Sequence, residues 1–278
     1  MGAKARGAVL ERLRGAGLTV RDLSGRDADE ALDLARSAVA DGGADGVEAL
    51  VVIGGDGMVH LGVNAVAGSQ TTLGIIPTGT GNDVARYFDL PRKDPLAAAD
   101  RVTAGATRTS DLARSGTKYF TTVLCAGFDA VVNERANDMT WPKGQMRYNL
   151  ATVAELRTFT PLTYTLDLDG ATRRIEAMLV AVGNGPSFGG GLRITEGASL
   201  DDGLLDVVII KPMGRLELVK TYPKLFKGTH TTHPQYERHR VRKVTVASAG
   251  ITAYADGERF GPLPLTVECV PGALTVYA

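Results

Sequence analysis

The chain has 278 residues, of which 44% are hydrophobic, and its 31 Lys and Arg residues balance 31 Asp and Glu residues. This composition is typical of a globular protein with one or two domains, and the zero net charge argues against a protein that attracts nucleic acid over long range. No stretch approaches the roughly 18 apolar residues of a membrane-spanning helix. We therefore expect a cytoplasmic protein whose membrane contact, if any, is peripheral.

The first hundred residues alternate between helical and strand patterns. Helices are predicted over 4–16, after Asp27 or Asp29, and after each of two glycine-rich turns, and strands are predicted over 18–20, 51–53 and 73–76. Alternation at this length predicts a parallel sheet with helices on both faces. We expect residues 1–105 to form an α/β nucleotide-binding domain.

The first glycine-rich turn, Gly54-Gly55-Asp56-Gly57, follows an apolar strand and precedes a helical pattern that begins at Met58. Glycines lack a Cβ and let a ligand approach the backbone, and the start of a helix offers unpaired N–H groups to an anion. The turn therefore suits a nucleoside triphosphate.

A second turn of the same design follows the next strand. It contains Thr78, Gly79, Thr80 and Asn82, whose hydroxyl and amide groups suit a phosphate, although Asn82 or Asp83 would alternatively cap the next helix. Open α/β sheets bind ligands at the carboxyl ends of their strands. We expect the two turns to face one crevice.

After residue 106 strand patterns predominate, and turns such as Asp169-Gly170 and Asp256-Gly257 are of the hairpin type. We expect residues 106–278 to form a mainly antiparallel β-rich domain. Strands are predicted over 118–125, 163–169, 175–182, 204–211, 241–247, 263–270 and 273–277, and helices over about 130–137, 146–159 and 215–226.

Two polar segments of this half invite functional interpretations. His230 and His233 lie three positions apart with no obvious third ligand, so we expect a solvated loop and no zinc site. The basic segment 236–243 is either a surface for lipid head groups or a polar loop that enters a strand.

Five motifs in order resemble those of the bacterial diacylglycerol kinase and lipid kinase family, which is related to the sphingosine kinases. They are Gly54-Gly55-Asp56-Gly57, Gly79-Thr80-Gly81-Asn82-Asp83, Gly189-Gly190-Gly191, Leu200-Asp201-Asp202-Gly203-Leu204 and Asp256-Gly257-Glu258. The resemblance covers nearly the whole chain. The first motif also occurs in NAD kinases and phosphofructokinases, whereas the second paired with the last is more specific to lipid kinases.

The resemblance implies an ATP-dependent transfer of phosphate to a lipid hydroxyl, with diacylglycerol as the expected acceptor and phosphatidic acid, a phospholipid precursor, as the product. It implies that Asp256 and Glu258 are catalytic, and we expect Asp256 to deprotonate the hydroxyl while Asp56 contacts the phosphates and Mg²⁺. The expected nucleotide-binding residues are Gly54, Gly55, Asp56, Gly57, Thr78, Gly79, Thr80 and Asn82.

The resemblance also implies a structural Mg²⁺ bound by Asp202 and by the backbone carbonyls of Ser199 and Leu204, because a hard cation prefers oxygen ligands. From the residues alone, however, Asp201-Asp202-Gly203 is better interpreted as an ordinary turn.

The sequence departs from the family pattern in two places. Met58 stands where the family has Thr, so that a hydroxyl facing the phosphates is missing, and His60 and Leu61 replace other polar residues. The family also begins with a strand before the helix 4–16, and no counterpart precedes that helix here. We therefore expect the natural product to begin upstream of Met1.

Two alternatives to the lipid kinase remain open. One is a kinase of a soluble substrate that resembles NAD kinase, and the other is a non-catalytic lipid-binding relative. The sequence does not specify which lipid alcohol is phosphorylated, and a homodimer is neither required nor excluded by it.

Overall fold

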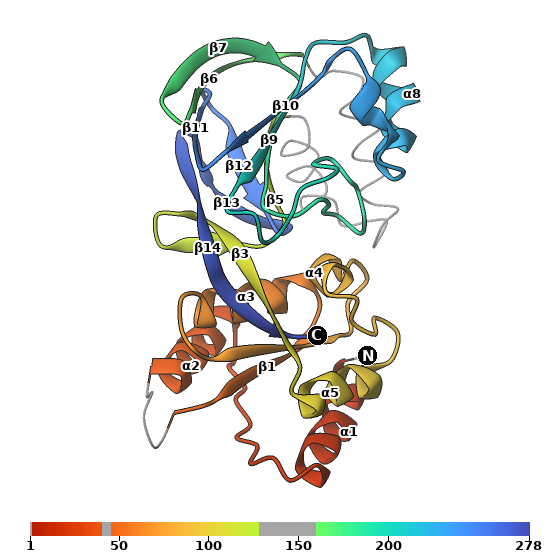
Figure 1. Cartoon of the computed structure of the whole chain (residues 1–278), viewed down its shortest axis with the longest axis vertical. Coiled ribbons are helices and arrows are strands. Elements are labelled where there is room, and N and C mark those ends of the chain that lie inside the picture. Colours follow the sequence, from red (N-terminus) through yellow and green to blue (C-terminus); the bar gives the residue numbers. More distant parts are fainter. Residues whose placement is uncertain (1, 41–45, 128–159) are drawn as a thin grey trace.

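The structure, a computed structural model, describes residues 2–40, 46–127 and 160–278. Two lobes are stacked along the long axis of the molecule, with most helices in one lobe and most strands in the other (Figure 1). This arrangement confirms the expected α/β half followed by a mainly antiparallel β half. The helices expected over 130–137 and 146–159 lie outside the described residues.

The helical lobe is built around two adjacent parallel strands. Residues 49–54 pair in parallel with residues 72–77 in continuous register, from Ala49 opposite Thr72 to Gly54 opposite Pro77. Both strands therefore end at the same edge, where the two glycine turns begin. The elements of this lobe are α1 (Gly2–Gly15), α2 (Ala28–Ala40), β1 (Ala49–Gly54), α3 (Asp56–Val66), β2 (Thr72–Pro77), α4 (Asp83–Tyr87) and α5 (Pro95–Ala104).

Its helices begin where the sequence provides caps. Asp27 accepts a hydrogen bond from the backbone N–H of Glu30 at the start of α2 (2.9 Å), as expected for a helix that starts after Asp27. Asp94 accepts hydrogen bonds from two backbone N–H groups of the first turn of α5, and Pro95 occupies the first helical position. Apolar side chains of α3 and α4 pack on the strands to form one core.

The β lobe contains two sheets that face each other across a hydrophobic core, in which Tyr164, Phe120 and Leu124 are among the fully buried side chains. The strands and helices of this half are β3 (Thr107–Ser115), β4 (Lys118–Phe120), β5 (Val123–Gly127), β6 (Leu162–Leu168), β7 (Ala171–Ala177), β8 (Leu179–Gly183), β9 (Leu205–Ile210), α8 (Arg215–Leu225), η1 (Thr229–Thr232), β10 (Tyr236–Val241), β11 (Lys243–Ala247), β12 (Thr252–Ala255), β13 (Glu258–Pro262) and β14 (Leu265–Tyr277).

One sheet has six strands in the order β10-β9-β8-β5-β12-β13, and the other has eight, with the path β1-β2-β14-β11-β6-β7 and with β3 and β4 attached to β14. The predicted hairpin turns at Asp169-Gly170 and Asp256-Gly257 connect β6 to β7 and β12 to β13. Asp169 and Asp256 both adopt positive φ, as such turns require.

The last strand joins the two lobes. β14 pairs with β11 at its start and with β2 at Val276, so the chain returns at its end to the helical lobe (Figure 1). The first 105 residues therefore do not form their sheet alone, because the final residues of the chain, in β14, pair with β2.

Several segments differ from the sequence predictions. The segment 118–125 is two strands, β4 and β5, in different sheets, and the segments 263–270 and 273–277 form the single strand β14. The segment 175–182 is two strands rather than one, because the chain passes from one sheet to the other at Met178, whose N–H bonds to Ile210 O. The basic segment 236–241 is the edge strand β10, not a loop. His230 is 1% exposed and therefore not solvated, since its Nε2 lies 3.2 Å from Ile194 O and its ring packs edge-on against Tyr236.

The strand expected over 18–20 does not form. This segment and the free edge of β1 line a groove of about 1450 Å³, so that the segment has no neighbouring strand to pair with. Ile53 of β1 and Leu34 of α2 line the groove, which extends to Met58 at the start of α3. The expectation of an upstream strand is not tested by these residues.

Within the described residues, none of the helices combines the length and the apolar character that crossing a membrane requires.

Candidate active site

The two glycine turns touch backbone to backbone at the end of β1 and β2. A Cβ added to Gly79 would lie 2.5 Å from the Cα of Gly55, and one added to Gly55 would lie 3.2 Å from the Cα of Gly79. The N–H of Thr78 donates to the Gly54 carbonyl at 2.8 Å. Glycine is therefore required here by the approach of one turn to the other, and the two turns form one surface as predicted.

Asp56 fastens the second turn to the first. Its Oδ2 accepts a hydrogen bond from the backbone N–H of Asn82 at 2.9 Å, and its Oδ1 accepts one from that of Asp83 at 2.8 Å. The carboxylate thus caps the N-terminus of α4 from another element, and its charge interacts favourably with the helix dipole there. A Cβ on Gly81 would lie 2.5 Å from Asp56 Oδ2, which explains this glycine as well.

Asn82 braces the turn instead of capping the helix. Its Oδ1 accepts from the Gly79 N–H at 3.2 Å, and its Nδ2 donates to the Gly79 carbonyl at 2.8 Å. Asn82 has φ 52°, a left-handed conformation that asparagine tolerates better than most residues. Asn82 occupies the N-cap position of α4, as one of the two expected residues, but its side chain makes no capping hydrogen bond because both of its polar atoms bond to Gly79.

The start of α3 remains open to a ligand. Gly55 is its N-terminal cap residue, and no side chain of the described residues caps this helix. Gly57 is exposed, as is Thr80 on the opposite turn, whereas Thr78 is half-buried. The first N–H groups of α3 therefore point to a place where phosphate oxygens can accept them.

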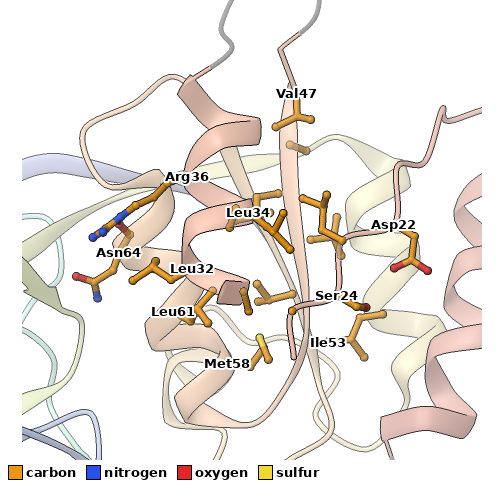
Figure 2. A pocket seen from close by; sticks show the side chains of 18 of the residues that line it. Asp22, Ser24, Leu32, Leu34, Arg36, Val47, Ile53, Met58, Leu61 and Asn64 are labelled. Carbon is orange, nitrogen blue, oxygen red and sulfur yellow. The ribbon is translucent and has the colours of Figure 1, made fainter. Parts of the chain in front are cut away.

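Met58 and Leu61 lie on the groove side of α3, not on the phosphate side. Met58 is 40% exposed, and both side chains extend into the groove in Figure 2. Leu61 also packs against the core of the helical lobe. The Cβ of Met58 would be 2.5 Å from a Cβ on Gly54, so this side chain and the glycine turn fit one another. Leu61, which stands where the family has a polar residue, therefore has a packing role.

Asp256 is a buried carboxylate, 7% exposed, at the tip of the β12–β13 hairpin. Its Oδ1 accepts from the Thr122 N–H and Oγ1 at 2.8 and 2.7 Å, and its Oδ2 accepts from the Thr121 N–H at 3.1 Å and lies 2.9 Å from His60 Nδ1. Burial alone would raise the pKa of Asp256, but the hydrogen bond and charge of His60, together with the Thr122 donors, outweigh it and lower the pKa.

His60 connects the two lobes through Asp256. Burial would lower the pKa of His60, yet the hydrogen bond and charge of Asp256, with a further contribution from Glu258, raise it. Asn64, one helical turn later, donates to the His60 and Tyr119 carbonyls at 2.9 and 3.0 Å and accepts from the Tyr119 N–H at 2.9 Å. α3 is therefore fixed against β4 and against the hairpin by the same two side chains.

Glu258 lies at the opening of the site, two residues after Asp256. Its side chain is exposed, and a Cβ on Gly57 would be 2.9 Å from its Oε1. The hairpin thus brings an accessible carboxylate against the first turn of α3. The structure brings together both predicted catalytic residues and both glycine turns.

Two residues of the predicted motifs, Asp83 and Gly190, and one residue that the sequence analysis did not name, Arg86, complete the site. Asp83 Oδ2 accepts from the Gly190 N–H at 2.7 Å, while its buried Oδ1 has no hydrogen-bond partner in the described structure. Burial, with a contribution from Asp56, raises the pKa of Asp83. Arg86 Nε also has no hydrogen-bond partner among the described residues, and it forms an ion pair with Asp83 Oδ1 at 3.8 Å. The only available signal was the position of Arg86, one turn beyond the second glycine motif.

The residues expected to bind a structural Mg²⁺ lie in a separate loop. Asp202 Oδ1 accepts from the Leu204 N–H at 3.0 Å, its Oδ2 pairs with Arg240, and Ser199 Oγ donates to Asp201 at 2.5 Å. A cation at this loop would have to displace Arg240. The oxygen atoms of Asp202 are therefore arranged for an ion pair with Arg240 rather than for a metal ion. The Mg²⁺ at this loop stays a prediction.

Comparison with known proteins gives consistent results. Residues 1–115 match the family model described as the diacylglycerol kinase catalytic domain, and residues 122–278 match the YegS C-terminal NAD kinase beta sandwich-like domain. A diacylglycerol kinase of Mycobacterium tuberculosis is 43% identical over 98% of this chain and 89% of its own length. One of Bacillus subtilis is 31% identical over 77% of this chain and 72% of its own length.

Solved structures show the same fold. A diacylglycerol kinase from Bacillus anthracis superposes with a TM-score of 0.80 at 24% identity, covering 99% of this chain and 91% of the other. An NAD kinase from Archaeoglobus fulgidus in complex with ATP reaches a TM-score of 0.57 at 12% identity, covering 98% of this chain and 89% of the other. The matched models, the extent of the sequence identity and the shared fold together show that this chain belongs to the diacylglycerol kinase family of kinases.

Proposed function

We propose that this protein is an ATP-dependent lipid kinase that transfers the γ-phosphoryl group of ATP to the free hydroxyl of diacylglycerol and releases phosphatidic acid and ADP. The relatives named diacylglycerol kinase, one of them 43% identical over nearly the whole chain, support this substrate. The single observation that carries the proposal is an exposed carboxylate, Glu258, held against the open start of α3 where two glycine turns meet.

The triphosphate would lie on the surface formed by the two turns. The uncapped N-terminus of α3 supplies N–H donors, and the half-exposed Arg86 supplies a positive charge. Because Arg86 Nε lacks a hydrogen-bond partner among the described residues, a phosphate oxygen would satisfy a donor that is otherwise buried without one.

Mg²⁺ would arrive with the nucleotide as part of the substrate. The carboxylates of Asp56 and Asp83 fit this ion, since the buried Asp83 Oδ1 has no hydrogen-bond partner in the described structure and a hard cation prefers carboxylate oxygens. When bound, Mg²⁺ would neutralise charge on the transferred phosphoryl group.

The geometry favours Glu258 over Asp256 as the proton acceptor, a change from the expectation based on the sequence. Asp256 is buried and already accepts hydrogen bonds from His60, Thr121 and Thr122. A group that is saturated by donors and has a lowered pKa is a poor base, whereas Glu258 is accessible to a substrate hydroxyl. Asp256 would then be a positioning residue that fixes the hairpin carrying Glu258.

In the proposed reaction Glu258 takes the proton of the lipid hydroxyl as the hydroxyl oxygen bonds to the γ-phosphorus of ATP. The bond from that phosphorus to the bridging oxygen breaks, and its electron pair leaves with ADP. The protein contributes by holding the acceptor, the base and the phosphates in line.

Because diacylglycerol stays in the bilayer, the enzyme would work as a cytoplasmic protein that associates peripherally with the membrane. The substrate is tested by incubating the purified chain with ATP, Mg²⁺ and either diacylglycerol, a sphingoid base, an isoprenoid alcohol or NAD, and identifying products by mass. We expect phosphatidic acid as the main product. Phosphorylation of NAD alone would assign the soluble-substrate alternative, and no product with any acceptor would favour the non-catalytic one.

A further inference from the structure

The outer side of α8 carries an apolar stripe that is largely exposed in the described structure, although the ring of Phe226 packs edge-on against that of Tyr222. Leu216, Val219 and Phe226 are 78%, 51% and 44% exposed, although large apolar side chains exposed to this extent are few in the described chain. They follow one another on α8 and the residue after it, with Pro223 between the last two. Spacings of three and four residues place these three side chains and Pro223 on one side of the helix. They form a contiguous apolar stripe, which is uncommon on a monomer surface without a partner.

A second stripe, next to the first, is basic. Lys220, Lys224 and Lys227 are exposed, again at spacings of four and three, and none forms an ion pair with a described residue. The acidic residue nearest to them in sequence, Glu217, is paired with His233 at 3.1 Å. We refer to the two stripes together as the α8 surface.

The opposite side of α8 accounts for the folding of the helix. Tyr222 and Leu225 pack against a buried cluster of the β lobe, and Thr221 and Leu218 line a small apolar cavity of about 60 Å³ beneath the helix. The inner side therefore suffices to hold α8 in place. The outer stripe is available for a function other than packing.

We propose that the α8 surface is where the protein docks on an anionic phospholipid bilayer. The inference rests on the proposed function, since it concerns an enzyme whose acceptor lies in a membrane, and it names the surface that makes the contact. A helix that presents apolar side chains beside lysines lies in the interface plane, with its apolar side chains in the acyl region and its ammonium groups at the phosphates. With no net charge on the chain, this local patch would orient the approach.

The cations of β10 do not offer such a surface. Arg238 pairs with Asp206, Arg240 pairs with Asp202, and the charges around Glu237 in β10 form a network with Arg173 and Lys211. These cations are already neutralised by the fold, unlike those of α8. Of the two places weighed for lipid head groups, charge complementarity favours α8.

The test is flotation of the purified full chain with extruded vesicles, without ATP and without diacylglycerol. One set is phosphatidylcholine alone, and the other contains about one part phosphatidylglycerol in four. One variant combines Leu216→Ser, Val219→Ser and Phe226→Ser, and a second combines Lys220→Gln, Lys224→Gln and Lys227→Gln.

Control variants carry the same kinds of change on the helical lobe, far from α8 in Figure 1. Leu18→Ser with Leu96→Ser removes two exposed apolar side chains, and Arg92→Gln with Lys93→Gln and Arg101→Gln removes three exposed charges. These controls separate the effect of the α8 surface from that of overall hydrophobicity or net charge.

We expect the unaltered chain and both controls to bind the anionic vesicles, and to bind less as salt is raised to about 0.5 M. The lysine variant should lose on the order of 100-fold in partition coefficient, and the serine variant at least about 10-fold. Thermal melting checks that each variant is folded, and the lysine variant, altered only at exposed positions, keeps the test valid if the serine variant melts early.

Failure of the unaltered chain to float, or equal flotation of all variants, would overturn the proposal. A serine variant that binds vesicles normally but changes from dimer to monomer in sedimentation would instead assign the α8 surface to a second copy of the chain. Turnover of a short-chain diacylglycerol dispersed in detergent tells the two proposals apart. If the chain floats without turnover, only the proposed function fails, and if turnover occurs without flotation, only the docking surface fails.

Discussion

Asp256→Asn should reduce both stability and turnover while leaving ATP binding intact. The substitution replaces one carboxylate oxygen by an NH₂ donor, which must then face either the donors of Thr122 or those of Thr121 and His60. It also removes the charge partner of His60 inside the site. Asp256 is 7% exposed, so water cannot compensate for either loss.

Breaking a buried charge pair in this way costs about 3–5 kcal/mol, and an unsatisfied buried donor costs about 1–3 kcal/mol. The two costs overlap, because the unsatisfied donor belongs to the broken pair, and they are therefore not added. We therefore expect the free energy of unfolding to fall by about 3–5 kcal/mol, which corresponds to roughly 6–20 °C in Tm. Turnover per folded molecule should fall about 100-fold, since the hairpin that holds Glu258 loses its attachment to α3.

The measurements are scanning calorimetry, ATP binding by isothermal titration, and the kcat for diacylglycerol phosphorylation below the variant's Tm. Asp111→Asn is the matched control. Asp111 is also buried and accepts hydrogen bonds from the Gly203 and Gly272 N–H groups at 2.7 and 2.8 Å, but it belongs to no part of the proposed site. The control should lose stability and keep its turnover. Unchanged turnover in Asp256→Asn would refute the positioning role.

Three further predictions follow from individual contacts. The pKa of His60 is raised in the folded protein, so its pairing with Asp256 stabilises the fold fully below the ordinary pKa of 6.5 and loses this contribution as pH rises through the raised pKa. His60→Gln should therefore flatten this part of the curve of Tm against pH. A curve that the substitution leaves unaltered would contradict the pairing. Gly79→Ala should weaken ATP binding at least about 10-fold, because the added Cβ would lie 2.5 Å from the Cα of Gly55. The control Gly7→Ala, in α1 with open space around it, should bind ATP normally. Equal ATP affinities of the two variants would show that the turns can move apart. Chelation of metal ions by EDTA in the absence of nucleotide should leave the Tm unchanged, because Arg240 already neutralises Asp202. If added Mg²⁺ instead raises the Tm, and Asp202→Asn abolishes this rise, the structural metal ion at this loop would be established.

The pattern of the sequence was sufficient to predict the parts of the site that are local in the chain. Both glycine turns, their position after adjacent parallel strands and the hairpin at Asp256-Gly257 could be predicted because each depends on a few consecutive residues. The contact between the turns followed from the rule that parallel strands end at one edge of a sheet.

The missed features depend on residues far apart in the chain. Capping of α4 by Asp56, the bond from Asp83 to Gly190 and the pairing of His60 with Asp256 join segments between 26 and 196 positions apart, and a local pattern contains no trace of them. For the same reason the sequence favoured Asp256 as the base. Only its burial and its set of donors distinguish it from Glu258.

The strand predicted over 18–20 is a feature that the local pattern predicts but the structure does not contain. Its residues have the apolar character of a strand, but a strand also needs a partner, and the groove beside β1 leaves it without one. The single strand predicted over 175–182 likewise contains two strands, since hydrophobicity alone does not reveal where a chain passes from one sheet to the other.

The central claim is that this chain phosphorylates diacylglycerol with Glu258 as the base, and the most direct test compares the unaltered chain with Glu258→Gln. Glu258 is exposed and the change is isosteric, so stability should change by less than about 0.5 kcal/mol. The rate of phosphatidic acid formation should fall by about 10²–10⁴-fold while ATP affinity stays the same. A Glu258→Gln enzyme that forms phosphatidic acid at the unaltered rate would contradict the account.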